Sequence, residues 1–81
     1  MIPLVFHPSV SKDIREVLDY YESISPVLAN AFWEEWQACI RAIQTAPTSH
    51  HFDVSGRRRV NLSRFPYHIL FRLQSSTIRV S

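Results

Sequence analysis

The sequence has very little glycine and cysteine, and it has no long apolar run. Its single glycine, Gly56, excludes a glycine-rich phosphate-binding loop, which needs several glycines. Its single cysteine, Cys39, cannot form an internal disulfide, and no basic segment followed by an apolar stretch opens the chain. The apolar runs are a few residues long, whereas a membrane-spanning helix needs roughly 20. We therefore expect a cytoplasmic protein with no membrane span.

Acidic residues are almost missing from the second part of the chain. Residues 47–81 contain Asp53 as their only acid, beside six arginines: Arg57, Arg58, Arg59, Arg64, Arg72 and Arg79. Residues 1–46 are acidic, with Lys12, Arg15 and Arg41 against Asp13, Glu16, Asp19, Glu22, Glu34 and Glu35. Arginine forms paired hydrogen bonds with phosphate and carboxylate groups because its planar fork matches both. The charge distribution therefore predicts an anionic partner.

The composition is that of a folded protein. Hydrophobic residues make up 46% of the 81 residues, and aromatic residues make up 12%. Disordered chains are poor in such residues, and a chain of this length has room for one small core. We expect residues 1–81 to form a single globular domain.

The first part of the chain predicts one strand and two helices. Residues 4–7 are a short apolar run closed by Pro8, which predicts a strand. Helical spacing of apolar residues predicts a helix over about 9–22, with Ser9 as its N-cap. A second helix is predicted to start at Ser25-Pro26 and to end at Pro47. The link of about three residues predicts an antiparallel helical hairpin.

The second part predicts a loop and three strands. Residues 48–56 are polar and irregular, and beyond them apolar and polar residues alternate with a period of two. The alternation covers residues 59–63, 68–73 and 78–80, with tight connections between these segments. The order β-α-α-β-β-β predicts an α+β fold in which the helical hairpin packs on a mainly antiparallel four-stranded sheet.

This order, together with the segment 57–73, resembles the RelE/ParE toxin superfamily, and especially its plasmid-stabilisation branch. In that branch a basic strand is followed by Phe-Pro-Tyr and an alternating aromatic strand, as in Phe65-Pro66-Tyr67 and Phe71 here. The helices fit the family layout through Asp13-Ile14, Val17 and Tyr20-Tyr21, and through Ala31-Phe32, Ile40, Ile43 and Pro47. The resemblance covers nearly the whole chain.

The resemblance implies the toxin component of a bacterial type II toxin–antitoxin (plasmid stabilisation) system. Such a toxin inhibits growth through a macromolecular target, either the ribosome with its mRNA or DNA gyrase, and a cognate antitoxin neutralises it. An alternative is an inactive remnant or regulatory module that binds only the antitoxin. This alternative arises because the chain ends at Ser81, before the tail where family nucleases carry further catalytic groups. The sequence leaves open the target, the activity of the short chain, its natural terminus and its oligomeric state.

A second alternative is a ribosome-dependent mRNA endonuclease. Family nucleases drive the RNA 2′-hydroxyl onto its own phosphate, which requires cations and groups that move protons. Here the third and fourth strands offer His68, Arg72 and Arg79 for those roles, with His68 as the acid or base. A half-exposed strand histidine without a catalytic role is the competing interpretation of His68.

Strand alternation also predicts an anion-binding face. It places Arg57, Arg59 and Asn61 on one face of their strand, and His68 and Arg72 on one face of the next, where Arg79 could join them. With Arg64, these residues are candidates for binding nucleic acid or an acidic antitoxin segment; the competing interpretation is the solvated side of a half-covered sheet.

The other candidate residues favour structural roles. His50 and His51 with Asp53 form no ligand set, and we expect neither a metal ion nor a cofactor. Helical spacing places Trp33 and Trp36 on the apolar face of the second helix, which predicts core packing for both. Cys39 lies near the same face and has no basic neighbour in the sequence, which favours a small core residue over a nucleophile.

Overall fold

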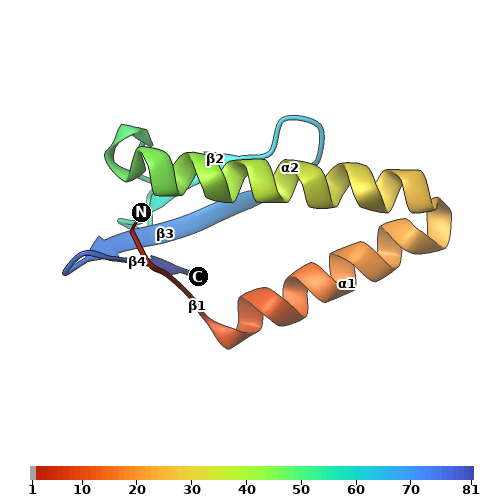
Figure 1. Cartoon of the computed structure of the whole chain (residues 1–81), viewed down its shortest axis with the longest axis horizontal. Helices are drawn as coiled ribbons and strands as arrows, with labels where there is room; N and C mark the ends of the chain where they lie inside the picture. Colours follow the sequence, from red (N-terminus) through yellow and green to blue (C-terminus); the bar gives the residue numbers. More distant parts are fainter. Residues whose placement is uncertain (1) are drawn as a thin grey trace.

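A computed structural model describes residues 2–81, which form two helices against one face of a four-stranded sheet (Figure 1). In chain order the elements are β1 (Leu4–Phe6), α1 (Pro8–Ile24), α2 (Pro26–Thr45), the short 3₁₀ helix η1 (Pro47–Ser49), β2 (Arg58–Asn61), β3 (His68–Gln74) and β4 (Thr77–Val80). This is the predicted β-α-α-β-β-β order, and the predicted α+β class is confirmed. Neither helix of the described chain is long and apolar enough to cross a membrane.

The sheet has the strand order β1-β4-β3-β2. The three strands after the helices form an antiparallel meander, while β1 pairs with β4 in parallel, with Leu4 opposite Ile78 and Phe6 opposite Val80. The sheet is therefore mainly antiparallel, as predicted, and its first strand lies at one edge beside its last. This arrangement brings the junction between β1 and α1 next to the end of β4.

The start of α1 and the link between the two helices differ from the sequence prediction. Helix α1 starts at Pro8, and the residue that caps it is His7, whose ring Nδ1 accepts a hydrogen bond from the Ser9 N–H (3.1 Å), so Ser9 as the predicted N-cap was wrong. Proline suits the first helical turn because its missing N–H is not needed there. The two helices are separated only by Ser25, so the link is shorter than predicted.

The core lies between α2 and the sheet. Phe32 and Ile43 of α2 and Phe71 and Ile78 of the sheet are at most 1% exposed. An aromatic cluster continues this core toward the hairpin, where Tyr21, Phe32 and Phe65 pack with ring centroids 5.1–5.8 Å apart. Trp36 packs against the core as predicted, but Trp33 is 39% exposed, so its predicted core position was wrong.

Candidate functional site

The strand register places the predicted polar residues on the face of the sheet opposite the core. Residues paired across an antiparallel sheet point to the same side, and Asn61 lies opposite His68 while Arg72 lies opposite Arg79. The same alternation places Arg59 on this face, and Arg57, just before β2, follows it. The prediction of a shared face is therefore confirmed.

Three of the arginines line one cavity. Arg57, Arg72 and Arg79 surround a pocket of about 310 Å³, whose other wall is formed by residues 5–8 at the β1–α1 junction and by Gln74, Val80 and Ser81. Arg72 and Arg79 are directly opposite each other on β3 and β4. Like charges placed opposite each other across two strands destabilise a sheet. The pocket therefore concentrates positive charge at an energetic cost.

These three arginines form no ion pair within the described chain. The pocket lining contains no aspartate or glutamate, and no salt bridge among residues 2–81 involves Arg57, Arg72 or Arg79. A guanidinium carries five N–H donors and no acceptor, so three of them offer a dense set of donors to an anion.

The other predicted anion-binding residues have partners inside the protein. Arg59 forms an ion pair with Asp53 at 3.2 Å and donates from Nε to the side-chain oxygen of Asn61 at 2.8 Å. Arg64 donates to the carboxylate of Glu35 at 3.1 Å. Apart from His68, the structure thus separates the predicted set into three arginines without an ion pair and three residues held in internal contacts.

Glu35 attaches the β2–β3 connection to α2. Its side chain is 11% exposed and accepts hydrogen bonds from the backbone N–H groups of Ser63 (2.5 Å) and Arg64 (3.0 Å). These bonds, first that from the Arg64 backbone and then that from its side chain, lower the pKa of the Glu35 carboxyl. The pKa of Asp53 is lowered in the same way, by the Ser55 N–H and then by Arg59.

Arg58 belongs to the scaffold of the site. Its guanidinium donates to the backbone oxygens of His50 (2.8 Å) and Thr48 (3.3 Å) and lies 4.2 Å from the centre of the Phe52 ring. Through these contacts Arg58 ties the loop after η1 to β2. The same loop contacts Arg57, because the Asp53 N–H donates to the Arg57 backbone oxygen at 2.6 Å.

His68 lies apart from the arginine pocket. It is four residues from Arg72 along β3, which at about 3.4 Å per residue is roughly 14 Å, and it does not line the pocket. The three residues predicted as catalytic thus share a face without forming one cluster. Arg72 and Arg79 are together, and His68 is separate.

His7 lines the arginine pocket, and sequence analysis did not select it. Its Nδ1 accepts the Ser9 backbone N–H and lies 2.8 Å from the Ser9 hydroxyl, so the cap fixes the ring. The signal in the sequence was the pair His7-Pro8, in which proline ends the strand and starts the helix, placing the histidine at the junction. Only the parallel β1–β4 pairing, which no local pattern reveals, brings that junction beside the arginines.

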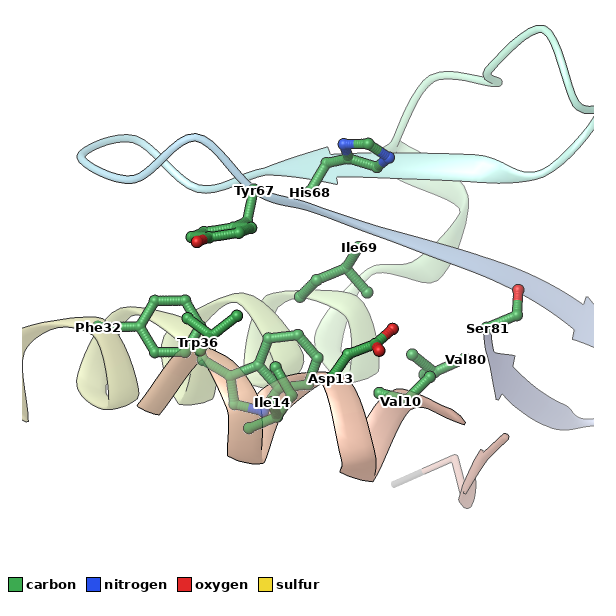
Figure 2. A pocket seen from close by; sticks show the side chains of 11 residues that line it. Val10, Asp13, Ile14, Phe32, Trp36, Tyr67, His68, Ile69, Val80 and Ser81 are labelled. Atoms are coloured by element: carbon green, nitrogen blue, oxygen red, sulfur yellow. The ribbon is translucent and has the colours of Figure 1, made fainter. Parts of the chain in front are cut away.

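A second cavity separates α1 from β3 (Figure 2). It has a volume of about 150 Å³ and mostly apolar walls, among them Val10, Ile14, Trp36 and Ile69. Figure 2 shows the Asp13 carboxylate at its rim, while the His68 ring points away from it, on the opposite side of β3 from Tyr67 and Ile69. We call this cavity the α1–β3 cleft.

The α1–β3 cleft adjoins a free part of the sheet edge. Strand β4 ends at Val80, opposite Phe71, and beyond it the Ser81 N–H donates to the Leu70 oxygen. Within the described chain, no strand pairs with His68 and Ile69 on that side of β3. Unpaired strand edges of this kind accept extended segments.

The remaining titratable candidates support the core. Burial, and then the nearby Glu35 charge, raise the pKa of the Cys39 thiol, which disfavours its reactive thiolate form. Burial and a hydrogen bond with Tyr67 raise the pKa of Tyr21 in the aromatic cluster. Across residues 2–81, no three His, Cys, Asp or Glu side chains lie close enough to hold a metal ion.

Fold and pocket together define an α+β protein with an arginine-lined cavity beside its first helix. Comparison of the chain with protein-family models, with curated proteins and with solved structures finds no match.

Proposed function

We propose that this protein is the toxin component of a bacterial type II toxin–antitoxin pair of the RelE/ParE kind. In this proposal the arginine pocket contacts an anionic macromolecular target, either the ribosome with its mRNA or gyrase with its DNA. The observation that carries the proposal is the grouping of Arg57, Arg72 and Arg79 without any carboxylate partner. The element order and the Phe65-Pro66-Tyr67 segment support the family assignment.

The α1–β3 cleft supports the second half of the proposal, which is neutralisation by a cognate antitoxin. An extended antitoxin segment could pair with the free edge of β3 at His68 and Ile69 and insert apolar side chains between Ile14 and Trp36. Asp13 at the rim would then favour a basic residue in that segment. Target and antitoxin would occupy different faces of the same sheet.

Growth after induction tests this proposal. We expect the wild-type chain to arrest a bacterial culture, and the product of the adjacent upstream reading frame to relieve the arrest. Arg72→Glu should abolish the arrest, because it places a negative charge in the pocket that binds the target. Arg15→Gln removes an exposed positive charge on α1 from a residue that lines neither the arginine pocket nor the α1–β3 cleft, and it should leave the arrest unchanged.

Other outcomes separate the competing functions. Unimpaired growth with good expression, combined with binding of the neighbouring product, would replace the toxin by a module that binds only the antitoxin. Codon-positioned cleavage of messages on ribosomes that requires His68, Arg72 and Arg79 would establish the endonuclease. Arrest that persists in Arg72→Glu would remove the arginine pocket from the mechanism.

A further inference from the structure

A groove of about 320 Å³ lies between α1 and α2, and no residue of the sheet belongs to its lining. The groove is lined by Leu18, Asp19 and Glu22 of α1 and by Ala29, Asn30 and Trp33 of α2. These residues belong to the linked ends of the two helices, which project beyond the sheet (Figure 1). We call it the hairpin groove. It shares no residue with the arginine pocket or with the α1–β3 cleft, so what it binds does not depend on the proposed function.

Trp33 leaves a large apolar surface uncovered in the hairpin groove. It is 39% exposed, whereas Trp36, three residues later on α2, packs against the core. Apolar surface that stays in contact with water forgoes the free energy of burial, and tryptophan is enriched among the residues that contribute most to protein interfaces. With Leu18 it gives the groove an apolar part that a ligand can cover.

The two acids of the hairpin groove lie where their own helix disfavours them. Asp19 and Glu22 are three residues apart, so they share one side of α1 and repel each other. Glu22 is also in the last turn of α1, where the negative end of the helix dipole disfavours an acid. Neither carboxylate forms an ion pair among residues 2–81, not even with Arg15, one turn before Asp19. A cation bound beside them would relieve both repulsions, which indicates a positively charged ligand.

An aromatic ring beside two carboxylates favours a guanidinium over an ammonium group. The planar guanidinium can stack on the face of a tryptophan while its N–H groups form paired hydrogen bonds with carboxylates. An ammonium group is a compact and strongly hydrated charge, and it lacks this fork. The aliphatic stem of an arginine can also lie along apolar surface such as that of Leu18. The groove therefore matches arginine in both its apolar and its charged parts.

We propose that the hairpin groove binds an arginine side chain of a basic protein segment, with the guanidinium against the Trp33 ring and paired with Asp19 and Glu22. The partner is recognised by its positive charge, whereas the partner proposed for the arginine pocket is anionic. The protein would then have two docking surfaces of opposite charge, one on the open face of the sheet and one between the helices.

An NMR titration of the isotope-labelled full-length chain tests this proposal. The probes are short acetylated alanine peptides with one central residue, which is arginine, lysine or citrulline, the uncharged analogue of arginine. We expect the arginine peptide to shift the indole N–H signal of Trp33 saturably and that of Trp36 much less. The lysine peptide should bind more weakly, and the citrulline peptide should leave both signals unchanged.

Two sets of substitutions connect the binding to the groove. Asp19→Asn with Glu22→Gln keeps the shape of the groove and removes its charge, so the Kd of the arginine peptide should rise at least about tenfold. Glu16→Gln with Glu34→Gln is the matched control, because it removes the same charge from exposed positions that do not line the groove, and it should leave the Kd unchanged. Trp33→Leu should also weaken binding, followed through the backbone amides of the groove, and the same spectra show whether the variant is folded.

The other outcomes would overturn the proposal in different ways. No binding, equal binding of the arginine and citrulline peptides, or shifts confined to the α1–β3 cleft would remove the hairpin groove as a site. Equal binding of the lysine peptide would overturn the assignment to arginine. Self-association of the free chain that Asp19→Asn with Glu22→Gln abolishes would replace the basic partner by a second copy. Growth arrest that depends on Arg72 would support the toxin proposal in each of these cases.

Discussion

At the scale of single residues, the decisive contacts are the ion pairs that neutralise two of the predicted anion-binding arginines. Arg59 and Arg64 resemble Arg72 and Arg79 in the sequence, yet they are bound by Asp53 and Glu35. The sequence places all four arginines in the strands of one sheet or in their connections, but it does not reveal which acids face them. Glu35 is 29 residues from Arg64 in the chain, and only the packing of α2 beside the β2–β3 connection makes them partners.

The Glu35 contacts predict a pH-dependent contribution to stability. Hydrogen bonds lower the pKa of Glu35 in the folded protein. The stability that Glu35 contributes is therefore fully present above pH 4.5, the ordinary pKa of a glutamate, and is lost as the pH falls through the lowered pKa of the folded protein. Urea denaturation of the wild type and Glu35→Gln at several pH values measures this. We expect the variant to be less stable at pH 7 and the difference to shrink below pH 4. A difference that does not change with pH would show that the carboxylate charge is not responsible.

At the scale of elements, local patterns predict the helices and strands well and their exact limits poorly. The period of apolar residues identified both helices and the meander because each of these elements buries one face. Local patterns missed the start of α1, since the cap at His7 uses a ring nitrogen of a residue type that is not a common N-cap. They also misjudged Trp33, which lies beside the buried stripe of α2, because one residue along a helix is a rotation of 100°.

The β3–β4 turn carries strain that substitution can remove. Its two central residues, Ser75 and Ser76, have φ angles of 47° and 68°, in the left-handed region that Asn and Gly adopt most easily. We expect Ser75→Asn with Ser76→Gly to raise the free energy of unfolding by about 1 kcal/mol, measured by urea denaturation. The control is Ser11→Gly within α1, which should lower the free energy by about 0.5 kcal/mol. A loss of stability in the turn variant would show that the positive φ angles are not strained.

At the scale of the whole molecule, the fold depends on a small core that every element shares. Phe71, Ile78 and Ile43 have no exposed surface, and they come from β3, β4 and α2. The sequence identifies these residues as apolar members of periodic segments. It cannot reveal that β1 joins the sheet beside β4, because that pairing depends on contacts between distant parts of the chain. The arginine pocket follows from this pairing, which explains why its His7 wall was not predicted.

Removal of one core side chain should destabilise the whole molecule. Phe71 is fully buried and contacts the His50 ring, with ring centroids 5.7 Å apart. We expect Phe71→Ala to cost about 3–5 kcal/mol, which is comparable to the total stability of many small domains. The loss of cooperative thermal unfolding in circular dichroism would confirm it. Phe52→Ala is the control, because the Phe52 side chain is 66% exposed and should change stability by much less.

The parallel pairing of β1 with β4 sets the order in which the chain can fold during synthesis. The two helices are adjacent in sequence and can pack as soon as both have left the ribosome, whereas Leu4 must wait for Ile78. Until then β1 has no partner strand, and the wall of the pocket formed by His7 is not beside the arginines. The pocket therefore forms late in synthesis, because His7 and the arginines can line one cavity only when β4 is in place.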